Sequence, residues 1–280
     1  MIGVFHGGCV HTNGPGKVAI NLIKGLKKLG LDVVENQEGD MTGCLASWSP
    51  RFKDLPSETL VGPNLVVIPP DDPTIWSHFK NFVVPCQWVK DKYERFSLTQ
   101  KTKIHTWAVG IDTELFCPSD KKEIDCFLYF KNGSQENRQK VIDTLEKRRI
   151  SFVEFKYGGY SETDFIKTVQ KCRFCILITD TESQGIAYQE ILSMGLPCYV
   201  INKPFWDYYP QFSCPSTSVP YFDTRCGFVC TDLSYFENFL SVVNLFEPRE
   251  YILDNLTLEK SASEYVKLLE ISHGNQTRVG

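Results

Sequence analysis

The chain has 280 residues, of which 42% are hydrophobic and 13% aromatic, and its formal net charge is −4. This length is enough for about two domains with separate cores, and no run of about 18 apolar residues marks a membrane span. The acidic balance excludes a chain-wide basic field for nucleic acid or anionic membrane, so we expect a globular protein that binds no nucleic acid.

The first residues, Met1-Ile2-Gly3-Val4-Phe5-His6, lack the basic start of a signal peptide and read as a first strand. The eleven cysteines are an odd number and lack the dense spacing of a disulfide scaffold. We therefore expect reduced thiols and a cytoplasmic protein. Cys172-Arg173-Phe174-Cys175 has no second C-x-x-C pair, and a buried strand is favoured there over a metal or redox site.

Residues 1–116 alternate strand-like and helical patterns, which predicts an α/β domain. A glycine loop, Asn13-Gly14-Pro15-Gly16, precedes a helix that starts near Gly16 or Lys17. Gly14 and Gly16 allow close backbone approach to a phosphate or sugar, and the helix adds its positive end. The alternative is a tight strand-to-helix turn without a ligand. Helices are expected at 17–29 and 88–96, and strands at 3–6, 32–35, 44–46, 65–68, 82–84 and 104–107.

The polar, proline-marked segment Cys117-Pro118-Ser119-Asp120-Lys121-Lys122 is typical of an inter-domain linker. We expect a second α/β domain at 117–257. Apolar residues at helical spacing predict further helices at 233–246 and from 258 to about 271. Before these, strands are expected at 125–130, 151–155, 174–178 and 198–201, and helices at 136–148 and 163–171.

Glu182 and Glu190 bracket Gly185 directly after the apolar run 174–178, which is typical of a strand buried on both faces. A strand, a glycine turn and a helix would place Glu182 beside the turn and Glu190 about two turns into the helix. Ligands of open α/β sheets bind at this end of the strands. The alternative is that Glu182 neighbours a helix cap and Glu190 is a solvated acid.

Three blocks, in order, carry a family resemblance. The run from Glu182 to Glu190, followed by Ser193-Met194-Gly195-Leu196-Pro197, resembles the E-x7-E signature of retaining glycosyltransferases of family four. The glycine loop is similar to that family's N-terminal loop, and residues 109–118 look like its G-[IV]-D-x-x-x-F-x-P stretch. The resemblance implies the GT-B fold: α/β, with two Rossmann-like domains facing across a cleft. It also implies that the last helix, at about 258–273, packs on the N-terminal domain.

The implied activity is retaining, metal-independent transfer of a hexose from a UDP- or GDP-linked sugar in glycan biosynthesis. The acceptor would be a glycan, a lipid or a small molecule. The chain has no D-x-D motif, so cations and amides would stabilise the departing diphosphate. Lys131 and Arg138 resemble the family's Arg and Lys at this place, with Lys140 as the fallback. A Lys stands where Arg is usual, and the spacing of seven is longer than the family's.

By the same resemblance, Glu182 would bind hydroxyls of the donor sugar and Glu190 the ribose hydroxyls. Ser183 would add a side-chain donor. The run Tyr157-Gly158-Gly159-Tyr160 would form a base pocket or be merely a loop. Sugar and phosphate oxygens would be held by the amides of Gln184, Gly185 and Ile186.

The family often has a histidine near the reacting centre, and His11, in the glycine loop, is the best-placed candidate here. His6 and His78 are the others, and a structural role is the alternative for each. Two other functions stay open: a catalytically inactive nucleotide-sugar binding module or partner subunit, and a GT-B enzyme that glycosylates a modified DNA base. Local basic clusters suggest solvated helix faces or peripheral contact with a membrane. They are Lys24, Lys27 and Lys28; Lys90, Lys92 and Arg95; and Arg138, Lys140, Lys147, Arg148 and Arg149.

Overall fold

The computed structural model of the chain describes residues 1–7, 14–49 and 51–274. These residues form two compact units. The first contains the described residues of 1–110 and those from 256 on, and the second spans 111–255. The chain therefore passes between the units twice, at Gly110/Ile111 and at Asn255/Leu256.

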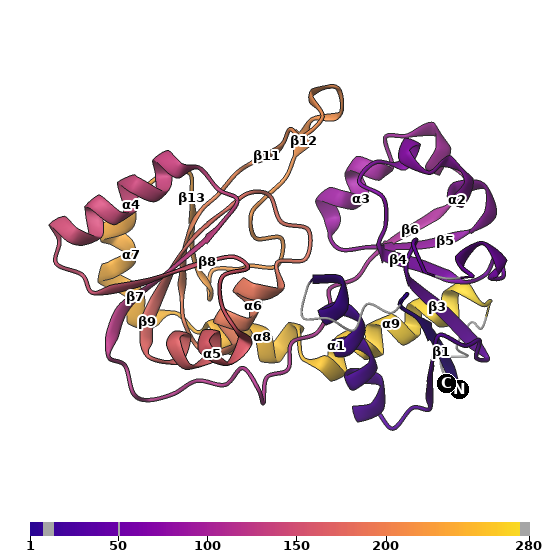
Figure 1. Ribbon diagram of the computed structural model, residues 1–280, viewed down its shortest axis with the longest axis horizontal. Coiled ribbons are helices and arrows are strands. Elements are labelled where there is room, and N and C mark those ends of the chain that lie inside the picture. The colour runs from indigo at the N-terminus through magenta and orange to yellow at the C-terminus, as the bar shows by residue number, and fades with distance from the viewer. Residues whose placement is uncertain (8–13, 50, 275–280) are drawn as a thin grey trace. The chain divides into compact units, whose positions relative to one another are not determined.

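The first unit is built on a six-stranded sheet in which every pair is parallel, with the order β2-β1-β3-β4-β5-β6 (Figure 1). All four residues of β1 are buried, as in a strand covered on both faces. The strands are β1 (Ile2–Phe5), β2 (Val33–Glu35), β3 (Met41–Ala46), β4 (Leu60–Asn64), β5 (Asn81–Val84) and β6 (Lys103–Thr106).

The helices of the first unit come from both ends of the chain. They are α1 (Gly14–Lys28), α2 (Pro73–His78), α3 (Gln87–Tyr93) and α9 (Leu258–Ser272), with 3-10 turns at Phe52–Asp54, Pro69–Asp71 and Ser97–Thr99. Helices α1 and α9 pack against each other. Gly25 makes this contact close, because a Cβ there would lie 2.8 Å from the Cβ of Ala262.

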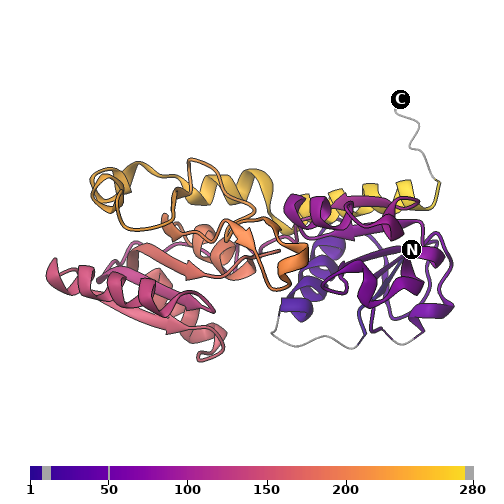
Figure 2. The ribbon, with the colours of Figure 1, turned by 90° about the horizontal axis from the view of Figure 1, so that it is seen from above.

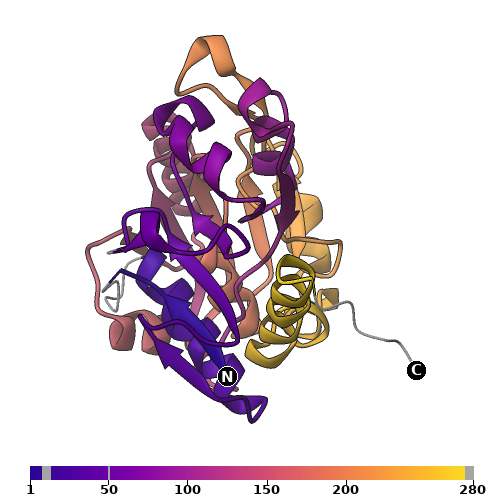
Figure 3. The same cartoon turned by 90° about the vertical axis from the view of Figure 1, so that its right-hand side faces the viewer.

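Helix α9 is held to β6 and its following loop by aromatic and polar contacts. The Nε1 of Trp107 donates a 2.8 Å hydrogen bond to the carbonyl of Ser261, whose Oγ donates to the carbonyl of Ala108. The ring of Tyr265 lies 4.8 Å from that of Trp107. Figures 2 and 3 show α9, in yellow, alongside the purple elements of this unit.

The strand expected at 65–68 is wrong. The fourth strand is β4, at Leu60–Asn64, and it contains Gly62 and Pro63, which usually interrupt a central strand. The φ of Gly62 is 113°, and a Cβ there would collide with the carbonyl of Val83 on β5. Glycine at this position thus lets the backbones of β4 and β5 approach each other. Gly62 and Pro63, which argued against a strand in the sequence, are therefore part of β4.

The second unit has a five-stranded parallel sheet with the order β13-β10-β9-β7-β8. A short antiparallel hairpin, β11 (Phe205–Trp206) with β12 (Cys214–Pro215), follows β10. The strands of the main sheet are β7 (Ile124–Lys131), β8 (Phe152–Lys156), β9 (Cys172–Thr179), β10 (Cys198–Ile201) and β13 (Gly227–Cys230).

Helices cover both faces of this sheet. Leu128 and Phe130 of β7 join a core cluster with residues of α4 and α7, whereas Phe127 and Tyr129 contact Phe165 of α5. The helix expected at 233–246 is shorter, and α8 was not predicted. The helices are α4 (Gln135–Lys147), α5 (Glu162–Gln170), α6 (Ile186–Ser193), α7 (Phe236–Val242) and α8 (Pro248–Asn255), with 3-10 turns at Pro210–Phe212 and Val243–Leu245. The unit is doubly wound.

The strand order of the second sheet fixes where a ligand would bind. The connection from β7 leads to β8 at one edge, while β9 leads on to β10 in the other direction. The direction of winding therefore reverses between the carboxyl ends of β7 and β9, where Lys131 is in register with Thr179. Open α/β sheets bind ligands at this switch point.

Arg249 of α8 ties the segment that enters the second unit to the end of α6. Its guanidinium donates to the carbonyls of Ser193 at 2.6 Å, Thr113 at 3.2 Å and Phe116 at 3.3 Å. The last carbonyls of a helix lack partners within it, so Arg249 supplies a donor that α6 needs. These bonds explain why the second unit begins at Ile111 rather than at the expected residue 117.

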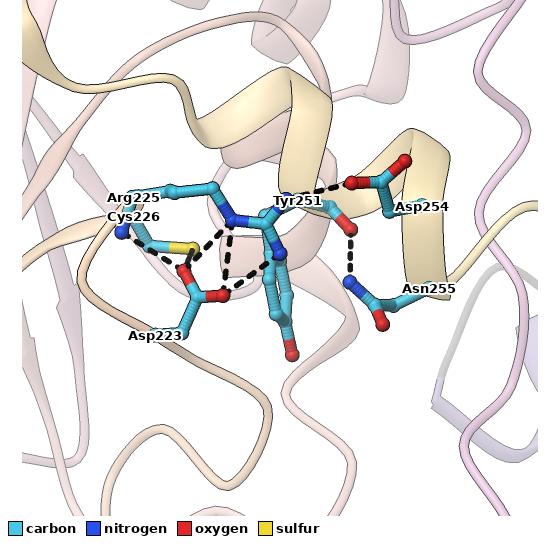
Figure 4. A network of polar contacts seen from close by, with 6 residues as sticks. All are labelled: Asp223, Arg225, Cys226, Tyr251, Asp254 and Asn255. Atoms are coloured by element: carbon cyan, nitrogen blue, oxygen red, sulfur yellow. Dashed lines mark hydrogen bonds and ion pairs between the residues drawn. The ribbon is translucent and has the colours of Figure 1, made fainter.

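A second arginine, Arg225, binds residues of α8 (Figure 4). Arg225 pairs with Asp223 at 2.8 Å and with Asp254 of α8 at 2.7 Å, and its guanidinium lies 5.3 Å from the ring centre of Tyr251. The pKa of the Asp223 carboxyl is lowered, chiefly by the hydrogen bond from Arg225. Because α8 packs on α6, both arginines hold α6 in place.

Replacing Arg249 with Ala removes three charge-assisted hydrogen bonds to carbonyls. We expect the free energy of unfolding to fall by about 2 kcal/mol, measured by urea denaturation. Arg173→Ala is the control, because its pair with Asp125 is exposed and 3.5 Å long, so a change below about 0.5 kcal/mol is expected. Equal effects of the two substitutions would contradict the anchoring role of Arg249.

Candidate functional site

An ion pair lies at the switch point of the second sheet. Lys131 is the last residue of β7, and Glu182 follows β9. The Nζ of Lys131 lies 2.7 Å from the Oε1 of Glu182, which also accepts a 2.9 Å hydrogen bond from the hydroxyl of Thr179. The side chains are 26% and 13% exposed, respectively. The pair is thus shielded but reachable from solvent.

Tyr157, just after β8, lies against the same ammonium. The Nζ of Lys131 is 4.7 Å from the centre of the Tyr157 ring, within the range of a cation–π contact. About half of Tyr157 is exposed, and Gly158 next to it has a positive φ of 81°. Lys131 therefore interacts with a carboxylate and with an aromatic ring whose surface a planar group could reach.

Glu190 is 2% exposed, so its interpretation as a solvated acid is wrong. Helix α6 begins at Ile186, which makes Glu190 its fifth residue, just over one turn in rather than two. Burial raises the pKa of Tyr160 to about 12 and also raises the pKa of Tyr129. The negative charge of Glu190 adds to both increases. The two tyrosine hydroxyls lie 2.8 Å apart. At neutral pH both hydroxyls are protonated and can donate and accept hydrogen bonds.

Gly185 sets the start of α6. Its φ of 69° is left-handed, and a Cβ there would overlap the ring of Tyr188. The hydroxyl of Tyr188 donates to the carbonyl of Tyr221 at 3.3 Å and accepts from its amide at 3.0 Å. The first amides of α6 have no partners within the helix, so an anion near Gly185 would be favoured.

The loop before α6 lines a small crevice of about 20 Å³ together with the ion pair. Gln184, Gly185 and Ile186 are buried, and Ser183 is half-buried. The structure thus brings Lys131, Glu182 and Gly185 together around one crevice. Its lining residues are Tyr129, Lys131, Leu177, Thr179, Glu182, Gly185, Ala187 and Tyr188.

A larger pocket, of about 390 Å³, lies at the carboxyl ends of β7, β9 and β10 and was missed in the sequence. Lys203 at its edge pairs with Asp180 at 3.0 Å and with Asp207 at 2.7 Å. The signal that could have found it is the polar run Asn202-Lys203 directly after a buried strand. The lining residues are Asn132, Gly133, Ser134, Asn137, Ile178, Thr179, Asp180, Ile201, Asn202 and Lys203.

Arg138 has a different partner from the expected diphosphate. It forms a two-pronged pair with Glu154 of β8, one contact measuring 2.5 Å, and its guanidinium lies 5.8 Å from the ring centre of Phe130. Lys140, the fallback, pairs with exposed Glu136 at 2.6 Å. Arg138 and Lys140 do not line the crevice or the larger pocket. Their binding of a diphosphate stays a prediction.

The pair with Arg138 makes stability depend on pH. Hydrogen bonds from Arg138 lower the pKa of the Glu154 carboxyl. The stabilisation is therefore present above the unfolded value of about 4.3 and is lost as the pH falls through the lowered folded value. Glu154→Gln should reduce the free energy of unfolding by about 2 kcal/mol at pH 7 and by much less near pH 2.

Urea denaturation at the two pH values measures this difference. Glu136→Gln is the matched control, because it removes an exposed pair on α4 and should change little at pH 7. A Glu154→Gln effect that is equally large at both pH values would show that it does not come from the carboxylate charge.

The expected residues of the first unit lie at the start of α1. Helix α1 begins at Gly14, two residues before the predicted start at Gly16. Gly14 is exposed, whereas Gly16 is buried. His11 lies outside the described residues. Buried His6 has its Nε2 3.2 Å from a carboxylate oxygen of Glu35, and the Nε2 of His78 is 2.9 Å from the carbonyl of Leu55.

Three features concern metals, thiols and membranes. Within residues 1–7, 14–49 and 51–274, no three His, Cys, Asp or Glu side chains are grouped to hold a metal ion. The cysteines of these ranges are free, and Cys175 is buried as expected.

No helix in the described part of the chain is long and apolar enough to cross a membrane. Of the basic clusters, Lys27 pairs with Glu35 and Lys28 with Glu259.

Comparisons with known proteins define the fold. No protein-family model matches the sequence, and no curated protein matches it. The structure is similar to a sucrose-phosphate synthase from Thermosynechococcus elongatus, with a TM-score of 0.61 at 11% identity over 98% of this chain and 99% of that one. It is also similar to the GtfA/B complex, with a TM-score of 0.52 at 13% identity over 91% of this chain and 60% of that one. The expected fold class, α/β with two Rossmann-like units of the GT-B type, is confirmed.

Proposed function

We propose that the protein is a glycosyltransferase that moves a hexose from a UDP- or GDP-linked sugar to an acceptor, with retention of configuration and without a metal. The observation that carries the proposal is the Lys131–Glu182 pair at the switch point of the second sheet, followed in the chain by α6, which carries buried Glu190. The likeness to a sucrose-phosphate synthase, whose name denotes synthesis of a sugar conjugate, supports sugar transfer.

Lys131 and Glu182 would act on opposite sides of the bond that breaks, Lys131 on the diphosphate and Glu182 on the sugar. A diphosphate leaving group gains negative charge, which the Lys131 ammonium and the first amides of α6 would stabilise. Glu182, an acceptor of hydrogen bonds, would bind the hydroxyls of the sugar. The Nζ of Lys131 and the Oε1 of Glu182 are in direct contact at 2.7 Å, so the pair would have to open for each group to reach its own part of the donor.

The nucleotide would occupy the β8 side of this site. Glu190 would accept hydrogen bonds from the ribose hydroxyls, and the half-exposed ring of Tyr157 would stack on the base. Gln184, Gly185 and Ile186 would hold phosphate and sugar oxygens through their amides, with Ser183 as a side-chain donor. Gly14 and Gly16, at the start of α1, stay predicted phosphate contacts of the first unit.

The transfer step needs no protein side chain as a base, because the departing phosphate can accept the proton of the acceptor. The acceptor oxygen bonds to the anomeric carbon as the bond from that carbon to the diphosphate oxygen breaks. The acceptor's proton passes to the departing phosphate on the same face of the sugar, which retains the configuration. The charge left on the diphosphate stays beside Lys131, so the reaction should continue in excess EDTA.

Substitution of the ion pair tests the function. Glu182→Gln and Lys131→Ala should each lower donor hydrolysis and transfer at least about 100-fold, because each group stabilises the transition state. Hydrolysis of the donor, first identified by a thermal-shift screen of UDP-, GDP-, ADP- and TDP-sugars, is the measurement. An inactive binding module would bind the donor without hydrolysing it.

Glu264→Gln and Lys267→Ala are the matched controls, since they break an exposed ion pair of the same type on α9, which has no predicted contact with the donor. Each should keep full activity. Melting temperatures near that of the parent show that the site variants fold. Near-normal turnover in Glu182→Gln would contradict the assignment.

Glu190→Gln tests the nucleotide side. The substitution keeps the shape of the side chain but weakens its acceptance of ribose hydrogen bonds, so the Kd of the nucleotide should rise about tenfold, or about 1.4 kcal/mol. Calorimetry with UDP and GDP measures it, with exposed Glu250→Gln on α8 as the control. An unchanged Kd would place the ribose elsewhere.

A further inference from the structure

The hairpin that follows β10 presents aromatic rings to solvent. Phe205 is 52% exposed, Tyr208 65% and Tyr209 40%. Trp206, between them in sequence, is buried, and its ring centre lies 6.1 Å from that of Tyr208 and 5.8 Å from that of Tyr209. Figure 1 shows the hairpin, in orange, protruding from the second unit. Tyr208 and Tyr209 are therefore grouped around Trp206, while Phe205 is exposed on the neighbouring position of β11, and exposed rings of this kind are typical of an interaction surface.

The hairpin is ordered by its own bonds. Phe205 pairs with Pro215 and Trp206 with Cys214 in an antiparallel ladder, and the amide of Ser216 donates to the carbonyl of Pro204 at 2.9 Å. Three prolines within it, at 204, 210 and 215, restrict φ. The backbone that carries the rings is therefore ordered before any ligand arrives, which lowers the entropy cost of binding.

The base of the hairpin is bonded to the loop of the candidate catalytic carboxylate. The amide of Glu182 donates to the carbonyl of Thr217 at 3.0 Å, and the hydroxyl of Thr217 donates to Asn202 Oδ1 at 2.9 Å. Asn202 and Lys203 also line the 390 Å³ pocket. The aromatic surface thus belongs to the same end of the second sheet as the Lys131–Glu182 pair.

We propose that this hairpin binds a neutral saccharide chain and that, given the proposed function, the chain is the sugar acceptor. The C–H faces of pyranose rings stack on aromatic rings, whose faces are electronegative. Tyrosine hydroxyls and the exposed side chains of Asp207 and Gln211, which neighbour the aromatic residues in sequence, suit sugar hydroxyls. Stacking gives contact area, and the polar groups give orientation.

Charge selects this occupant over others. Lys203 pairs with Asp207 and Asp180, so the hairpin carries no excess of cations for a nucleic acid or an anionic lipid. Insertion into a bilayer would also bury the exposed carboxylate of Asp207 away from water, which is costly. A neutral saccharide requires neither an excess of cations nor removal of that carboxylate from water.

Saccharide binding is measured on the full chain by saturation-transfer NMR and affinity electrophoresis. The probes are maltohexaose, cellohexaose, mannohexaose and chitopentaose. At least one should bind saturably, and Phe205→Ala and Tyr208→Ala should each raise its Kd about fivefold or more. Tyr235→Ala is the matched control, since Tyr235 is 60% exposed and lies at the start of α7, and it should leave the Kd unchanged.

Several results would overturn the proposal. They are no saturable binding to any of the probes, a Kd that the hairpin substitutions do not change, and binding to phosphatidylcholine vesicles that Tyr208→Ala abolishes. Self-association that Tyr208→Ala abolishes would assign the surface to a second copy of the chain instead. The binding assays need neither donor nor turnover. A failure of donor hydrolysis therefore contradicts the proposed function, whereas a failure of saccharide binding contradicts the hairpin proposal.

Discussion

The Lys131–Glu182 ion pair depends on the order of strands in the second sheet. The two residues lie far apart in sequence and meet only because β9 adds beside β7 after the chain has passed through β8. Attraction within such a shielded pair is largely offset by the loss of hydration, so it adds little to stability. Its position at the switch point gives it a different use: both charges face the end of the sheet where ligands bind.

The groups behind this pair fix one helix. Gly185, in a left-handed conformation, is the residue directly before α6. Tyr188 in the first turn is held by hydrogen bonds between its hydroxyl and the backbone carbonyl and amide of Tyr221. Arg249 holds the other end of α6, while Arg225 fixes α8 against it. Holding both ends of α6 fixes the position of buried Glu190, while the loop before the helix carries Glu182. These contacts therefore fix the helix that carries one of the two carboxylates.

Local patterns in the sequence predicted much of the fold, and long-range pairing explains what they missed. The apolar runs at 174–178 and 198–201 are strands because burial on both faces demands such residues. Gly62 and Pro63 concealed β4, since their fit depends on the backbone of β5. Likewise, the ion pair between Arg138 and Glu154 was not predicted, because nothing in the order of residues shows that Glu154 lies beside Arg138. The burial of Glu190 was equally invisible, because it comes from neighbouring elements.

The aromatic hairpin and the loop that carries Glu182 are joined by a backbone hydrogen bond. A single backbone bond joins Glu182 to Thr217, so a shift in the hairpin's base moves the loop that carries the carboxylate. Pre-ordered rings lose little entropy on binding, and the energy of contacts far from the reacting bond can then hold an acceptor in place. A saccharide seated on these rings would therefore bear on the position of Glu182. Under this proposal, recognition of the acceptor and alignment of the donor would depend on the same few bonds at the end of β10.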